Sequence, residues 1–259
     1  MLRAALAFAL LASPLGAGEG KPGHMRGELP GPKKKDPPLV YACYAPRAYD
    51  SAKPAPLFVA IHGGRGSAEQ IAKFLTPFAE ATGAVLACPQ GFQEIIGADG
   101  YWWQGNKQEL AAIERLIAHA QAAYAIDPAR ISIFGLADGG ELAARFALSE
   151  DRKIQGLLLL NILWDQKQKI GAPKTLRVAV LACEEAQEKR ESLKEHAERA
   201  VAEIGKAGLP TVLRIHPGRS RSFFHAWETD FARAHEWFCG IRDWKRELAE
   251  ATPPAPPPK

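Results

Sequence analysis

The sequence predicts an α/β protein with a mostly parallel central sheet that is covered by helices on both faces. Short apolar runs alternate with longer amphipathic segments along the body of the chain, which is the pattern of repeated strand–helix–strand units. Several of these runs are apolar throughout, as expected of strands that are buried on both faces. With 259 residues, of which 47% are apolar and 24% charged, the chain can bury a core without metals or disulfides.

The predicted elements alternate in a regular order. The first half of the chain is expected to contain strands at 39–44, 57–61 and 84–88 and helices at 67–82 and 108–124. Ser67 is placed as the N-cap of the first helix and Gly83 as its stop. The second half is expected to contain strands at 130–134, 157–160, 176–181 and 211–215 and helices at 139–148, 186–206 and 227–238. In such sheets, functional sites form at the carboxyl ends of the strands.

Both ends of the chain are predicted to lie outside this domain. Residues 1–18 combine one positive charge, a short apolar core and small residues at the exit, which is typical of a cleavable export signal. Residues 19–38 are rich in Gly, Pro and Lys and are predicted to be a flexible leader, while residues 251–259 are predicted to be a proline-rich tail. Residues 39–250 are therefore expected to form one domain of a secreted or periplasmic protein.

Composition excludes several classes of function. The net charge of +4 is too small to indicate a nucleic-acid-binding protein, and no apolar run is long enough to span a membrane. The histidines and cysteines lack metal-ligand spacing, so neither a metal nor another cofactor is expected. Two possibilities stay open for the cysteines, which are buried free thiols or one disulfide among Cys43, Cys88, Cys183 and Cys239.

Two glycine-rich turns follow predicted strands. Residues 134–140 read FGLADGG and join a strand to a helix, and residues 61–67 read IHGGRGS. The sequences PQG at 89–91, WW at 102–103 and IDPARI at 126–131 complete an ordered set. Over residues 39–240 this set resembles the α/β-hydrolase superfamily, in particular its polyhydroxybutyrate-depolymerase and feruloyl-esterase-like branch. The resemblance implies an α/β-hydrolase fold, and the segment 161–175 is too short to hold a lid domain.

The resemblance also implies a catalytic triad of serine, histidine and a carboxylate, but this chain has other residues at all three positions. Ala137 stands at the nucleophile position of the Gly-x-Ser-x-Gly turn. Arg221, which stays protonated and only donates hydrogen bonds, stands at the base position. Ala186 stands at the acid position, with Glu184 and Glu185 as neighbouring carboxylates. These replacements predict a catalytically inactive pseudohydrolase.

Asp138, beside the turn, is a possible replacement nucleophile. Centring the turn on Asp138 puts Leu136 where a small residue is required, whereas Gly135 and Gly139 bracket Ala137. The backbone N–H of Asp138 is therefore expected to form an oxyanion hole with that of Gly64.

The altered positions predict a ligand site for a small or polymeric molecule. Together with Arg221, the N–H groups of Gly64 and Asp138 are suited to a carboxylate, phosphate or sulfate group. Alternatively, Arg221 forms an inert ion pair with Glu184 or Glu185. His62 fits a structural role in its loop as well as a ligand contact, and the two tryptophans fit core packing as well as an aromatic wall. The candidate ligand-binding residues are His62, Gly63, Arg65, Trp102, Trp103, Gln104 and His225.

Two other functions stay open. The protein is an active carboxylic ester hydrolase if His225 is the base and Ser220 or Ser222 is a nucleophile outside the turn. It is a cell-envelope interaction protein if the basic run at 33–35 provides the binding surface.

Overall fold

The computed structural model describes residues 20–97, 100–150, 152–164, 170–184, 192–216 and 227–250. The predicted export signal and proline-rich tail lie outside the described residues. So do six residues of the predicted sites, namely Glu185, Ala186, Ser220, Arg221, Ser222 and His225.

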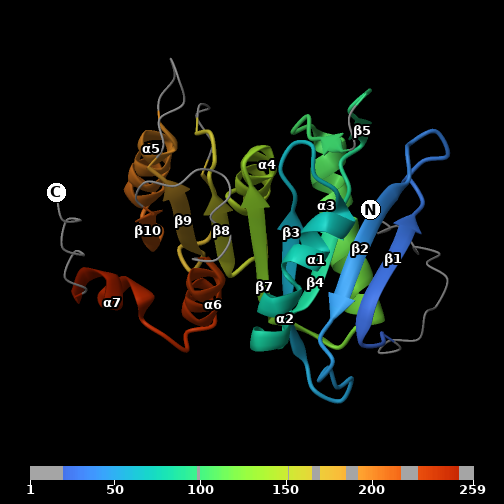
Figure 1. Cartoon of the computed structure of the whole chain (residues 1–259), viewed down its shortest axis with the longest axis horizontal. Helices are drawn as coiled ribbons and strands as arrows, with labels where there is room; N and C mark the ends of the chain where they lie inside the picture. The colour runs from blue at the N-terminus through green and yellow to red at the C-terminus, as the bar shows by residue number, and fades with distance from the viewer. Residues whose placement is uncertain are drawn as a thin grey trace, which may run out of the picture.

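Within the described residues, the core is an eight-stranded sheet with the order β1-β2-β4-β3-β7-β8-β9-β10 (Figure 1). Strands β1 and β2 pair antiparallel, as do β2 and β4, and all other neighbours in the sheet are parallel. The strands are β1 (Gly23–Leu29), β2 (Leu39–Ala45), β3 (Ala55–Ile61), β4 (Val85–Pro89), β7 (Ile126–Leu136), β8 (Gly156–Leu160), β9 (Arg177–Cys183) and β10 (Thr211–His216). A separate hairpin consists of β5 (Gln93–Glu94) and β6 (Tyr101–Trp102).

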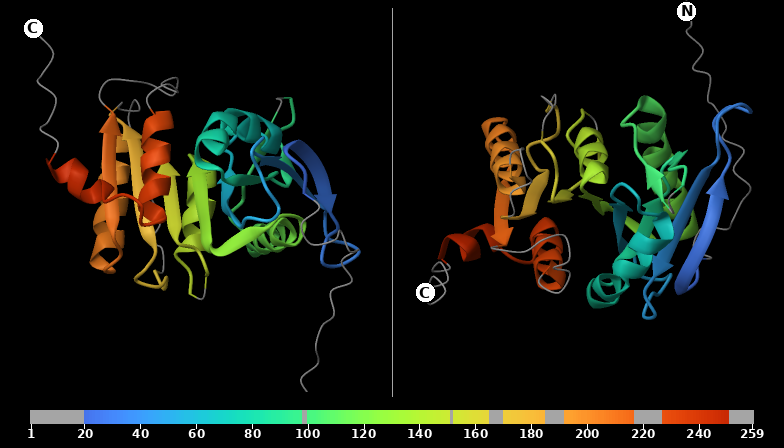
Figure 2. Two further views of the ribbon diagram at one scale, coloured as in Figure 1. Left: turned by 90° about the horizontal axis from the view of Figure 1, so that it is seen from below. Right: turned by 45° about the horizontal axis from the view of Figure 1, so that its top comes forward.

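Helices cover both faces of this sheet. Figure 2 shows α3, α4 and α5 on one face and α1, α2 and α6 on the other. The helices are α1 (Ala68–Phe74), α2 (Thr76–Thr82), α3 (Lys107–Ala123), α4 (Asp138–Ala147), α5 (Leu193–Lys206), α6 (Trp227–Phe238) and α7 (Trp244–Glu250). Strands β3, β4 and β8 are buried at every position, because side chains on both of their faces pack against helices. The predicted fold class is confirmed, and no additional domain interrupts the described part of the chain.

The prediction of a flexible leader over residues 19–38 is wrong for its central part. Gly23–Leu29 forms β1, which pairs with β2 along its whole length. The ring of His24 lies 4.4 Å from that of Tyr44, and Arg26 forms a 3.0 Å ion pair with Glu69. The backbone hydrogen bonds of β2 thus order a segment whose composition is that of a linker. The basic run at 33–35 lies exposed in the connection between the two strands.

The single helix predicted at 67–82 is instead two short helices. Ser67 caps α1 by accepting a hydrogen bond from the Gln70 N–H at 3.2 Å, and Gly83 ends α2 with a φ of 71°. Between them, Pro77 occupies the first turn of α2. Proline has no N–H to donate and disfavours helical conformation in the residue before it, so a new helix starts there.

Three further features complete the fold. The hairpin β5–β6 and helix α7 were not predicted, and β7 begins four residues earlier than the predicted strand at 130–134. All four cysteines are free thiols, so the disulfide alternative is not realised. No helix among the described residues is long and apolar enough to cross a membrane.

Candidate functional site

The turn between β7 and α4 is a strained elbow centred on Ala137. Its backbone has φ 48° and ψ −118°, a combination that side-chain-bearing residues rarely adopt. The Ala137 N–H donates to the Leu160 carbonyl of β8 at 2.9 Å, and the Ala137 carbonyl accepts from the Gly140 N–H at 2.8 Å. The hydrogen bond from Ala137 to β8 and the hydrogen bond from Gly140 at the start of α4 hold the elbow in place. Ala137, and not Asp138, therefore occupies the apex.

Three glycines allow the close packing around this elbow. A Cβ on Gly139 would lie 2.2 Å from the His62 carbonyl oxygen, and one on Gly135 would lie 2.4 Å from the Gly140 Cα. A Cβ on Gly140 would lie 2.3 Å from the side chain of Ile162. Real Cβ contacts are not that short, so each position requires glycine because of its neighbours.

The strained backbone yields a prediction at Ala137. Replacing Ala137 by Gly is expected to raise the free energy of unfolding by about 1 kcal/mol, because relief of strain, about 1–3 kcal/mol, exceeds the added freedom of the unfolded chain, about 0.4–1 kcal/mol. Urea denaturation measures this change. The matched control, Ala111→Gly on the exposed side of α3, is expected to lose about 1 kcal/mol. A loss of stability in Ala137→Gly as large as in the control contradicts the strained elbow.

The Asp138 carboxylate lies on the predicted oxyanion hole. Its Oδ2 accepts the Gly64 N–H at 3.2 Å, so an anion of the protein itself already uses this donor. Asp138 is the first residue of α4, where a negative charge is stabilised by the helix dipole. A second anion 4 Å away would be repelled by roughly 4 kcal/mol at the effective dielectric of a protein surface. In the described geometry the Gly64 N–H is therefore not vacant, while the predicted anion site that combines it with the Asp138 N–H and Arg221 stays a prediction.

The two adjacent tryptophans have different surroundings. Trp102 is 44% exposed, and its indole lies against the Gly64 backbone. Trp103 is 5% exposed and donates from its indole N–H to the His62 carbonyl at 2.8 Å. Trp102 therefore borders the site, whereas Trp103 packs beneath it.

His62 is a buried part of the loop scaffold. Its Nδ1–H donates to the Gly63 carbonyl at 2.8 Å, and its Nε2 accepts the Gly91 N–H at 3.2 Å. Burial lowers the pKa of His62 to about 4, so the ring is neutral near pH 7. Both ring nitrogens are engaged within the protein, so His62 orders the loops and does not face a ligand. Gly63 is likewise buried beneath the elbow.

Two other candidates lie on the exposed rim. Arg65 is exposed, and its backbone N–H donates to the Tyr101 carbonyl of the hairpin at 3.1 Å. Gln104 is also exposed, and its backbone N–H donates to the Glu109 carboxylate. That carboxylate also accepts the Asn106 N–H and so closes the capping box of α3. These contacts fix the hairpin and α3 beside the elbow, and they leave the Arg65 side chain at the surface.

The fold is similar to that of solved structures of hydrolytic enzymes. An S-formylglutathione hydrolase from Agrobacterium tumefaciens is 14% identical with a TM-score of 0.64, and the match covers 88% of this chain and 98% of that one. A poly(3-hydroxybutyrate) depolymerase from Bordetella parapertussis is 19% identical with a TM-score of 0.55, covering 87% and 93%. A ferulic acid esterase is 12% identical with a TM-score of 0.65, covering 86% and 99%. No family model and no curated protein matches the sequence.

The chain has the α/β-hydrolase fold. In this fold, the nucleophile stands on a sharp turn between a strand and a helix, and the backbone N–H of the next residue helps to bind the oxyanion. Ala137 occupies the first position and Asp138 the second. The elbow of the α/β-hydrolase fold is thus present in its backbone and lacks a nucleophilic side chain.

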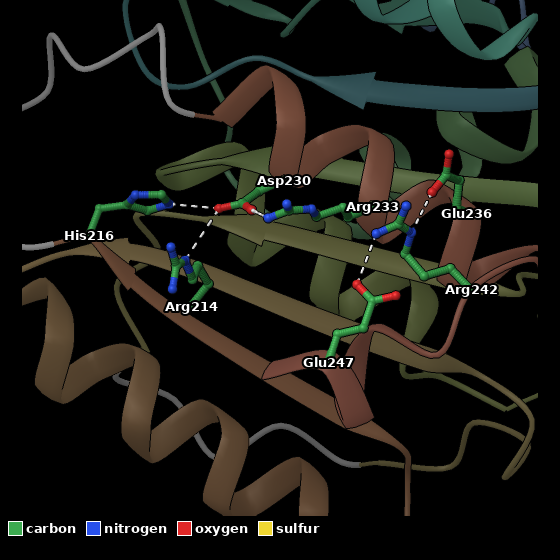
Figure 3. A network of polar contacts seen from close by, with 7 residues as sticks. All are labelled: Arg214, His216, Asp230, Arg233, Glu236, Arg242 and Glu247. Carbon is green, nitrogen blue, oxygen red and sulfur yellow. Dashed lines mark hydrogen bonds and ion pairs between the residues drawn. The ribbon is translucent and has the colours of Figure 1, made fainter. Parts of the chain in front are cut away.

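A second polar cluster lies at the end of β10 (Figure 3). The buried Asp230 of α6 lies 3.0 Å from His216 Nε2, and Arg214 and Arg233 lie at 3.6 Å and 3.4 Å from its carboxylate. On the same helix, Glu236 forms an ion pair with Arg242 at 2.6 Å, and Arg242 also contacts Glu247 of α7. This cluster joins α6 to β10 and to α7.

The Nε2 atom of His216 is engaged by the Asp230 carboxylate, so this pair fastens the end of β10 to α6. At the end of β9, the exposed Glu184 lies 3.5 Å from Lys194, on the helix that follows.

Among the predicted site residues, the structure brings together Gly64, Trp102, Ala137 and Asp138 at the carboxyl ends of the strands. The sequence predicts a role for the Asp138 backbone N–H but not the contact of the Asp138 carboxylate with Gly64. One signal was present, because Cβ bonds in a helix point toward its N-terminus. A carboxylate on the first residue of α4 is thereby directed back to the loop after β3.

Proposed function

We propose that the protein is a secreted, catalytically inactive pseudohydrolase that binds a ligand at the position of a former esterase site. The observation that carries this proposal is the pairing of Ala137 at the elbow with the Asp138 carboxylate on the Gly64 N–H. Alanine has no lone pair with which to attack an ester carbonyl. The carboxylate occupies a donor that an esterase needs for its oxyanion.

Three lines of support come from outside the elbow. Arg221 at the base position cannot accept a proton from a nucleophile. The predicted export signal over residues 1–18 supports secretion. The esterase-like neighbours support the ancestry of the site.

Ester hydrolysis tests the proposal directly. The native protein is expected to hydrolyse p-nitrophenyl butyrate no faster than buffer does. The triple variant Ala137→Ser, Ala186→Asp and Arg221→His is expected to gain activity because it restores a nucleophile, a base and an acid. Its matched control carries Ala186→Asp and Arg221→His without the serine and is expected to stay inactive.

Activity in the native protein would contradict the proposal and favour the alternative of an active carboxylic ester hydrolase. In that case, native activity lost in Ser220→Ala or Ser222→Ala and in His225→Ala identifies a nucleophile and base outside the elbow.

A further inference from the structure

The chemical class of the ligand follows from two side chains that meet over Gly64. A Cβ placed on Gly64 would lie 2.5 Å from Asp138 Oδ2 and 2.8 Å from Trp102 Cζ3. A carboxylate oxygen and an indole carbon therefore both lie within 2.8 Å of one point. Because residue 64 is glycine, no Cβ occupies that point. The Asp138 carboxylate and the Trp102 indole therefore lie close together above the Gly64 backbone.

Among the described residues, the charged group near this point is the Asp138 carboxylate. Among the residues that the structure describes, no lysine, arginine or histidine forms an ion pair with Asp138. The neighbouring Arg65 is exposed, and none of the described ion pairs joins it to this carboxylate. Asp138 is itself half-buried, and its described polar contact is the Gly64 N–H. A half-buried carboxylate with no basic partner among the described residues attracts a cation.

The indole beside it is available to a ligand. Trp102 is 44% exposed, in contrast to the 5% of Trp103. Indole rings bind cations through their electron-rich faces, and a nearby carboxylate adds a direct charge contact. Such a pair suits an alkylated ammonium group, because the methyl groups pack on the ring while the charge faces the carboxylate.

A metal ion is a poorer fit than an organic cation. No group of three or more His, Cys, Asp and Glu residues in the described part of the chain is placed to hold a metal. One carboxylate and an indole do not provide the six to eight oxygen ligands that a calcium ion takes.

We infer that Asp138 and Trp102 form a binding site for a quaternary or alkylated ammonium group on the ligand of the pseudohydrolase site. This inference rests on the proposed function, since it takes the elbow to be a binding site. It inverts the charge preference of an esterase, because the place that stabilises a developing oxyanion in an active enzyme holds a carboxylate here.

The test is isothermal titration of the full chain with choline chloride, in a buffer whose ionic strength is matched with sodium chloride. Saturable binding is expected. Asp138→Asn keeps an acceptor for the Gly64 N–H but removes the charge, and it is expected to weaken binding roughly fivefold or more. Trp102→Leu is expected to cause a loss of similar size. Glu94→Gln, an exposed carboxylate on the neighbouring hairpin, is the matched control and is expected to leave binding unchanged.

A neutral isostere separates charge recognition from burial of methyl groups. The alcohol 3,3-dimethylbutanol has the shape of choline without its charge and is expected to bind roughly fivefold more weakly or worse. Equal binding of the two compounds, unchanged binding in Asp138→Asn, or no binding of choline by the native protein would each overturn the inference. None of these results bears on ester hydrolysis, so the cation site and the pseudohydrolase proposal fail separately.

Discussion

Removing the Asp138 carboxylate from the triple variant with a rebuilt triad is expected to raise its rate of ester hydrolysis by roughly 10²-fold. The substitution Asp138→Ala frees the Gly64 N–H, which now donates to Oδ2 at 3.2 Å, and retains the backbone N–H of residue 138. It also removes a negative charge that would oppose the negative charge developing on the substrate oxygen in the transition state. The rate constant kcat for p-nitrophenyl butyrate measures the change.

Two comparisons make this expectation specific. Adding Glu94→Ala to the triple variant removes one exposed carboxylate from the neighbouring hairpin and is expected to leave kcat unchanged. Adding Asp138→Ala to the native protein is expected to give no hydrolysis, because Ala137 still provides no nucleophile. Equal kcat values with and without Asp138→Ala in the triple variant would show that the carboxylate does not block the donor.

The central sheet could be predicted from the sequence because its strands are recognisable one by one. Strand β8, for example, is a run of four leucines after Gly156, and it was predicted at 157–160. Such strands are buried on both faces, so their composition alone marks them. Strand β1 is different, since its residues GHMRGEL contain two glycines and three charged or histidine side chains among mostly exposed positions. It forms because β2 offers a free edge, and this information lies elsewhere in the chain.

The candidate site was predictable in its backbone and less so in its side chains. The spacing of Gly135 and Gly139 identified the elbow, and the structure has its strained apex at Ala137. The different surroundings of Trp102 and Trp103 follow from strand geometry, because successive side chains point to opposite sides of β6 and its extension. Which of the two sides faces the core depends on the position of the hairpin and on Gly64. The side of β6 that faces the core is set by tertiary packing, so the local sequence does not reveal it.

Replacing Gly139 by Ala is expected to lower the free energy of unfolding by about 3 kcal/mol or more. The new Cβ would lie 2.2 Å from the His62 carbonyl oxygen and 2.8 Å from that of Ile61. Both neighbours are backbone atoms at the end of a central strand, so they cannot rotate away as a flexible side chain can. The helix α4 must instead move away from β3, which also separates Asp138 from Gly64.

Urea denaturation against a matched glycine distinguishes this contact from a general effect of the substitution. A Cβ on the exposed Gly205 near the end of α5 would contact only Thr211 Oγ1, at 3.8 Å. Gly205→Ala is therefore expected to gain about 0.5–1 kcal/mol from helix propensity. If Gly139→Ala is as stable as the native protein, the close approach of α4 to the loop after β3 is incorrect. In that case the contact between the Asp138 carboxylate and Gly64, on which the loss of the oxyanion hole rests, also has to be abandoned.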